Sequence, residues 1–204
     1  KKIYLWLQED FASWTPVIFS VHPHKGMEIA DVDNDGDPDL ILNGYWMETP
    51  DDLRNNSVIE HVIDEKWYNQ KTGKWMDNSC RVAVADINDD GWLDVILSHS
   101  EMRGYPVSWY ENPGTKPDKV WIEHVIGQMV YCHTLIEQDM DMDGDIDIIA
   151  GELIHSTDPD KNGEHPLVVF INQGHGQSWR LQTVAVHGIY GGEVGDLDDD
   201  GDFE

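Results

Sequence analysis

Short apolar runs of about four to eight residues, separated by turn residues, recur along the whole 204-residue chain. Within these runs apolar and polar side chains alternate, and no segment shows the 3.6-residue period of an amphipathic helix. Runs of this length, bounded by Gly, Pro, Asn and Asp, are typical of β-strands. The pattern therefore predicts an all-β protein.

The runs repeat in a fixed order around four acidic segments, at residues 31–39, 86–94, 139–147 and 196–204, whose first residues are 55, 53 and 57 positions apart. One run precedes each acidic segment, at residues 27–30, 82–85, 134–137 and 192–195. A second run follows three of them, at residues 40–43, 95–98 and 148–151. The third and fourth runs form aromatic hairpins, at residues 3–6 with 14–21, 107–110 with 121–126, and 168–171 with 179–186. A repeat of this length with four antiparallel strands is typical of a propeller blade.

The chain begins on the third strand of one unit and ends on the last position of the fourth acidic segment. We therefore expect one domain over residues 1–204, a β-propeller fragment of about four four-stranded blades that is incomplete at both ends. The full ring would have about seven or eight blades, with the rest supplied by sequence outside this chain. An open stack completed by a partner chain is the alternative.

Each acidic segment places short oxygen-bearing side chains at its first, third and fifth positions, a glycine at its sixth and a carboxylate at its ninth. Such side chains turn inward around one centre, and calcium tolerates an irregular oxygen cage well. An EF-hand is excluded, because position twelve is Leu42, Leu97 or Ala150 where that motif has a bidentate Glu. A catalytic pair is disfavoured because these carboxylates share one environment. We expect structural calcium.

Composition supports this interpretation. The formal charge is −27, and half of the 40 acidic residues lie in the four acidic segments. Nucleic acid is disfavoured as a partner because the chain has no basic stripe, and no apolar run is long enough for membrane insertion. Loops of this density indicate an extracellular, periplasmic or cell-surface protein, where calcium is abundant. Cys80 and Cys132 either pair or remain two free buried thiols.

The acidic segments resemble the FG-GAP/VCBS repeat family, whose members include the integrin α-subunit propeller. The resemblance covers essentially the whole chain and implies calcium bound by the side chains at positions one, three, five and nine. The implied ligands are Asp31, Asp33, Asp35, Asp39, Asp86, Asn88, Asp90, Asp94, Asp139, Asp141, Asp143, Asp147, Asp196, Asp198, Asp200 and Glu204. Because Asn88 is neutral, we expect the second site to bind more weakly. Glu204 is longer than the Asp of the other segments.

The second unit contains about ten extra residues within positions 64–79, including Trp67, Tyr68 and Trp75. Aromatic residues on a connecting loop predict a sugar-stacking surface. The alternative is that these rings pack on their own blade.

The first residues of the inner strands are expected to line a central channel. Six positions before the acidic segments stand Lys25, Cys80, His133 and Tyr190; Arg81 lies one position further in its unit, and the outgoing strands add His99 and Glu152. These positions are polar and differ between units, which is typical of a site built on a repeat scaffold. His61 and His124 instead occupy equivalent strand positions, which predicts a structural role.

The channel residues suit β-elimination of an acidic polysaccharide. Arg81 or Lys25 would neutralise a uronate carboxylate, and His133 or Tyr190 would serve as base and acid. His99 and Glu152 would contact the substrate. The set resembles that of propeller-type polysaccharide lyases, and residues 108–114 (Ser-Trp-Tyr-Glu-Asn-Pro-Gly) are similar to segments of their bacterial relatives. Two alternatives stay open: a non-catalytic glycan- or protein-binding (adhesion) propeller, and a sugar dehydratase or isomerase.

Overall fold

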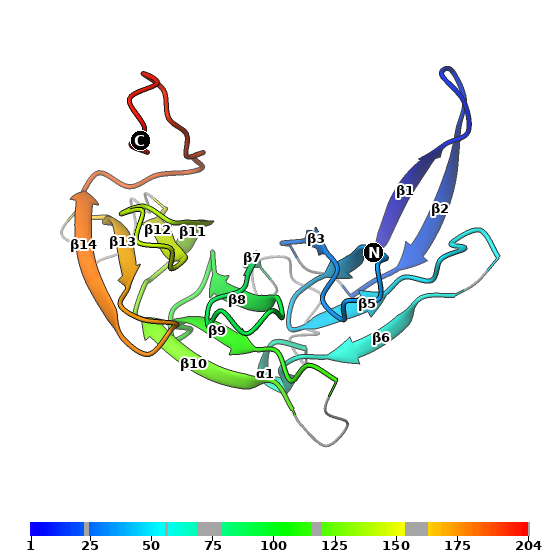
Figure 1. Ribbon diagram of the computed structural model, residues 1–204, viewed down its shortest axis with the longest axis horizontal. Helices are drawn as coiled ribbons and strands as arrows, with labels where there is room; N and C mark the ends of the chain where they lie inside the picture. The colour runs from blue at the N-terminus through cyan, green and yellow to red at the C-terminus, as the bar shows by residue number, and fades with distance from the viewer. Residues whose placement is uncertain (23–24, 56, 69–78, 116–119, 154–162, 204) are drawn as a thin grey trace.

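The computed structural model describes residues 1–22, 25–55, 57–68, 79–115, 120–153 and 163–203. These residues form fourteen β-strands and one four-residue helix, so the predicted all-β class is confirmed. Successive sheets follow one another along an arc, from β1 and β2 at one end to β14 at the other (Figure 1). Within the described ranges, no helix is long and apolar enough to cross a membrane.

Three four-stranded antiparallel sheets form in sequence order, each an uninterrupted meander. The first contains β3 (Glu28–Ala30), β4 (Asp39–Ile41), β5 (Tyr45–Glu48) and β6 (Ile59–Val62). The second contains β7 (Cys80–Ala85), β8 (Asp94–His99), β9 (Val107–Glu111) and β10 (Ile122–Gly127). The third contains β11 (Cys132–Gln138), β12 (Asp147–Glu152), β13 (Leu167–Asn172) and β14 (Trp179–Ala185). Each sheet therefore matches one predicted unit, with the acidic loop between its first two strands.

A two-stranded hairpin precedes these sheets and consists of β1 (Lys2–Gln8) and β2 (Trp14–Ser20). It corresponds to the last two strands of a unit. Ile3 and Leu5 of β1 and Val17 of β2 pack with Phe19 against the first sheet, so the hairpin shares a core with its neighbour.

The innermost strands β3, β7 and β11 lie next to one another on the inner side of the arc (Figure 1). Buried side chains fill the spaces between sheets. One cluster includes Trp46 of the first sheet and Tyr110 of the second, and another includes Trp109 of the second and Phe170 of the third. This packing brings the first residues of the inner strands together, which positions the site described below.

Two predictions about secondary structure were wrong in detail. Residues 192–195 form no strand, because no second strand lies beside them to supply hydrogen bonds among the described residues. The insertion of the second unit contains the short helix α1 (Glu65–Tyr68), which no apolar period predicted. Asp64 caps it by accepting hydrogen bonds from the backbone N–H groups of Lys66 and Trp67.

The cysteines are two free, buried thiols. Cys80 donates its S–H to the carbonyl of Lys25 and Cys132 donates to that of Thr134. Burial raises the pKa of both thiols to about 12, so neither is a nucleophile at neutral pH.

Candidate functional site

All four acidic loops share two left-handed backbone positions. The fourth residue adopts a left-handed conformation, with φ between 57° and 65°, at Asn34, Asp89, Met142 and Asp199. The sixth residue is always a glycine with φ between 85° and 100°, where an L side chain would be strained. The sequence pattern therefore corresponds to a repeated local geometry.

The first-position carboxylate holds the loop together. In the first loop, Asp31 accepts hydrogen bonds from the backbone N–H groups of Asp35 and Gly36, at 3.1 and 3.0 Å. The same pair of bonds recurs at Asp86, Asp139 and Asp196. Carboxylates at the head of these loops therefore have a structural role in addition to any ligand role.

The ninth-position carboxylates of the first three loops are fully buried, with no exposed surface. In the second loop, Asp94 accepts from the backbone N–H groups of Ile87 and Asn112, at 3.1 and 2.8 Å. Asp39 and Asp147 make equivalent pairs of bonds. Burial outweighs these bonds and raises the pKa of Asp39 to about 6 and that of Asp94 to about 7.

The loops bring together some of the predicted ligands. Carboxylate oxygens lie within 4.8 Å of one another in three sets of predicted ligands: Asp31 with Asp33 and Asp39, Asp139 with Asp141 and Asp143, and Asp196 with Asp198 and Asp200. A further set joins Asp33 and Asp35 to Glu48 of β5, a residue that the repeat pattern did not indicate.

The second loop differs from the others. The amide of Asn88 donates to Asp90, with 3.3 Å between Asn88 Nδ2 and Asp90 Oδ2, so the loop satisfies part of its own acceptors. Glu204 lies outside the described residues. Oxygen-rich sets of this kind fit a hard divalent cation.

Asparagine side chains link neighbouring loops. The Asn112 amide donates to the carbonyls of Val32 in the preceding loop and Leu93 in its own loop, both at 2.8 Å. Asn172 donates in the same way to Ile87 and Ile146, both at 3.3 Å. In the first sheet Thr49 occupies this position, and its hydroxyl reaches the Pro38 carbonyl of its own loop.

The structural role predicted for His61 and His124 is confirmed. His61 stacks on Trp46 with ring centroids 4.3 Å apart, and His124 stacks on Trp109 at 4.2 Å. Each imidazole also pairs with a glutamate, Glu48 at 2.7 Å and Glu111 at 3.0 Å. These histidines are part of the repeated architecture.

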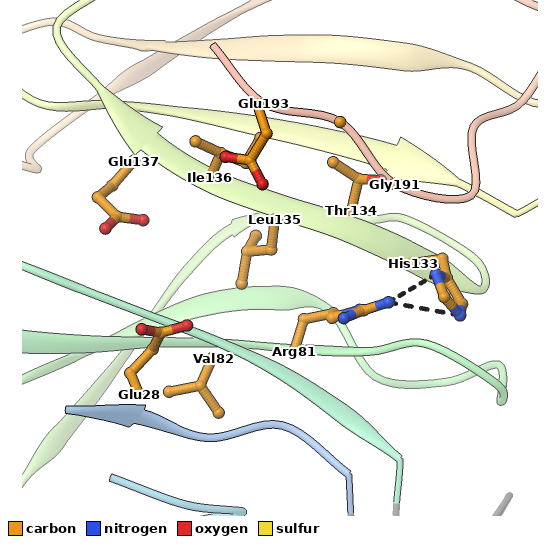
Figure 2. A pocket seen from close by; sticks show the side chains of 11 residues that line it. Glu28, Arg81, Val82, His133, Thr134, Leu135, Ile136, Glu137, Gly191 and Glu193 are labelled. Atoms are coloured by element: carbon orange, nitrogen blue, oxygen red, sulfur yellow. Dashed lines mark hydrogen bonds between the residues drawn. The ribbon is translucent and has the colours of Figure 1, made fainter. Parts of the chain in front are cut away.

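A pocket of about 620 Å³ lies where the inner strands begin, and its lining does not repeat. Arg81 of β7 and His133 of β11 stand together at one end of it (Figure 2). Arg81 Nη2 lies 2.7 Å from His133 Nδ1 and 3.5 Å from His133 Nε2. The structure therefore brings together two of the four predicted catalytic residues from neighbouring sheets.

Tyr190 joins this pair from the segment after β14. Its ring centroid lies 4.4 Å from that of His133, and its backbone carbonyl oxygen is 2.6 Å from His133 Nδ1. The Tyr190 carbonyl only accepts and the Arg81 guanidinium only donates, so His133 Nδ1 stands between an acceptor and a donor. Burial lowers the pKa of His133, and the nearby Arg81 and Lys25 charges act in the same direction.

Lys25, the fourth predicted catalytic residue, reaches the group through Glu101. Its Nζ lies 2.6 Å from Glu101 Oε1, and that oxygen lies 3.9 Å from His133 Nε2. Glu101 is 8% exposed and the Lys25 side chain is 34% exposed, so the carboxylate of this pair is buried and the ammonium group is partly exposed. The charge of Lys25 is thus compensated by a carboxylate of the second sheet.

His99 and Glu152 are buried polar residues on the outgoing strands. His99 Nδ1 accepts from the backbone N–H groups of Glu101 and Met102, both at 3.1 Å, and so positions the Glu101 segment. Glu152 accepts from the backbone N–H of Val130 at 2.9 Å. The described residues that line the pocket of Arg81 and His133 include neither His99 nor Glu152.

The aromatic insertion packs inward in its described part. Trp67 is 1% exposed and donates its indole N–H to the Tyr110 hydroxyl at 2.8 Å. The Tyr68 hydroxyl donates to Glu60 at 2.5 Å, and its ring contacts those of His22 and Tyr45. This arrangement favours packing over sugar stacking for Trp67. Trp75 lies outside the described residues.

Three glutamates that the sequence reasoning did not select also line the pocket: Glu28, Glu137 and Glu193. They stand two or three positions before an acidic loop, where the other units have Ile29, Ala83, Val84, Ile136 and Val194. A charge at a position that is otherwise apolar in the repeat is the signal that could have identified them.

No family model matches the chain, and no curated protein matches it. The resemblance to FG-GAP/VCBS repeats therefore depends on the acidic loops themselves.

Proposed function

We propose that the pocket between β7 and β11 binds an acidic polysaccharide and cleaves it by β-elimination. The supporting observation is the convergence of Arg81, His133 and Tyr190 from three segments far apart in the sequence. An arginine, a neutral imidazole and a phenol are the groups that this reaction requires.

The proposed reaction begins when the Arg81 guanidinium pairs with the uronate carboxylate, which makes the adjacent C–H more acidic. The imidazole of His133 takes that proton, and a carbon–carbon double bond forms as the glycosidic C–O bond breaks. Tyr190 gives its phenol proton to the leaving oxygen and regains one from solvent, while His133 releases its proton. Burial keeps the pKa of His133 low, so the ring is neutral and ready to act as base at neutral pH.

We further propose that the sheets are blades of a calcium-stabilised β-propeller of the FG-GAP/VCBS kind, secreted or displayed at a surface. Three successive meanders, the two left-handed positions shared by the four loops and inner strands on one side of an arc support the architecture. Calcium would be held by the oxygen-bearing side chains at positions one, three, five and nine and would neutralise the mutual repulsion of their carboxylates. It has a structural role in this proposal.

The test is the appearance of unsaturated uronate, followed by ultraviolet absorbance, on a panel of uronate-containing polysaccharides. We expect turnover by the wild-type protein, and losses of about 100-fold or more in kcat for His133→Ala and for Arg81→Ala. Tyr4→Phe on β1, which is 52% exposed, is the matched control for Tyr190→Phe.

Absence of turnover on every polymer, or full activity in a His133→Ala, Tyr190→Phe double variant, would refute the proposal. If the wild-type protein binds these polysaccharides but does not cleave them, it is a recognition propeller, which is the alternative function. Circular dichroism of each variant separates a lost reaction from a lost fold.

A further inference from the structure

The pocket of Arg81 and His133 has two walls of opposite character. Arg81 and His133 form one end, and the carboxylates of Glu28, Glu137 and Glu193 lie away from them, with Val82 and Leu135 between (Figure 2). The three glutamates come from β3, from β11 and from the segment after β14. Different segments thus place negative charge on the same side of one cavity.

The positive charge available to a ligand is small. Arg81 is the one cation among the described lining residues, and Lys25 nearby is paired with Glu101. One guanidinium faces three carboxylates, so the pocket as a whole repels additional anions. One negative group placed at Arg81 should strengthen the binding of a ligand. A second negative group along the glutamates should weaken it.

The carboxylate wall does not resemble the acidic loops. In the acidic loops, carboxylate oxygens lie within 4.8 Å of one another. Among the described residues Glu28, Glu137 and Glu193 form no such set, so they are not arranged around one cation. Thr134, which also lines the pocket, is 4% exposed, and its hydroxyl has no hydrogen-bond partner among the described residues. A hydroxyl of this kind can both donate and accept, whereas ionised carboxylates only accept.

Sugar hydroxyl groups match this wall. They donate to carboxylates and exchange hydrogen bonds with a threonine hydroxyl, and they add no negative charge. We infer that the pocket takes one uronate carboxylate at Arg81 and an uncharged, hydroxyl-rich sugar along Glu28, Glu137 and Glu193. This inference rests on the proposed function and narrows its substrate to a polymer in which uronates alternate with neutral sugars.

The experiment compares three polymers under the same conditions: a homopolymer of uronate, a copolymer of uronate alternating with a neutral sugar, and that copolymer after chemical sulfation. We expect kcat/KM on the neutral copolymer to exceed the other two values by about tenfold or more, because like charges oppose one another in the pocket. The Glu28→Gln, Glu137→Gln, Glu193→Gln triple variant should lose most of this preference. Glu164→Gln, at an exposed glutamate outside the pocket, should retain it.

Equal kcat/KM on the homopolymer and the neutral copolymer would overturn the inference while leaving the elimination reaction intact. If the wild-type protein cleaves none of them, the proposed reaction fails, and calorimetric titration with oligosaccharides of the same three types decides the inference separately. Tighter binding of the alternating neutral oligosaccharide supports it, and equal or weaker binding refutes it. If the triple variant does not fold, Glu193→Gln alone, outside any strand, should show a smaller loss of preference.

Discussion

The acidic loops and the beginnings of the inner strands are both rich in ionisable groups, yet they differ in one respect. The loops repeat the same φ angles, the same first-position hydrogen bonds and, in three sheets, the same buried ninth-position carboxylate. Near the beginnings of the inner strands the contacts differ between units: Lys25 pairs with Glu101, whereas Arg81 and His133 contact each other. Repeated chemistry thus accompanies the scaffold, and chemistry that changes between sheets accompanies the pocket.

Removal of divalent cations is expected to separate the two regions most strongly. If the loops hold calcium, excess chelator should lower the free energy of unfolding by about 3 kcal/mol for each site whose free calcium was 100 times its Kd. Thermal unfolding with and without chelator, followed by calcium addition, measures this. An unchanged Tm would show that the loops are stabilised by their own hydrogen bonds and hold no structural calcium.

Asp94→Ala should produce the largest effect of a single loop substitution. It leaves the buried N–H groups of Ile87 and Asn112 without their acceptor, which should cost about 3 kcal/mol. Urea denaturation gives the change. Asp89→Asn, at the exposed left-handed position of the same loop, is the matched control and should change stability by less than about 0.5 kcal/mol.

Asn112→Ala and Asn172→Ala compare two copies of one link between sheets. Asn112 donates twice at 2.8 Å and Asn172 twice at 3.3 Å, so we expect losses of about 2 and about 1 kcal/mol. Urea midpoints for the two variants provide the measurement. Equal losses would mean that the longer bonds contribute as much as the shorter ones.

His133→Gln should have the smallest effect on stability. The effect should be visible in how the free energy of unfolding changes with pH. Because burial lowers the pKa of His133, the unfolded chain binds its proton more readily, and wild-type stability falls as the pH drops through about 6.5. The variant lacks this contribution, so its free energy of unfolding should fall less between pH 7 and pH 5. Parallel curves for the two proteins would contradict the assignment of a buried, neutral imidazole.

The sequence predicted the sheets well because each strand is short, local and flanked by a recognisable acidic loop. Counting back from the acidic loops also located Arg81, His133 and Tyr190, whose contacts depend on sheets lying side by side. It failed at residues 192–195, because a strand requires a neighbour and the pattern describes one segment at a time. It also passed over Glu137 and Glu193, since nothing in a linear repeat says which charged side chains face a shared cavity.

The Asn112 and Asn172 amides also bear on the order in which the chain acquires its structure. Each completes the hydrogen bonding of a loop that precedes it by a whole sheet, since the carbonyls of Val32 and Ile87 receive their donors from the next unit. A loop is therefore finished only after its successor has folded. Adjacent units should then behave as coupled neighbours in folding and unfolding, so loss of one sheet loosens the loop of the sheet before it.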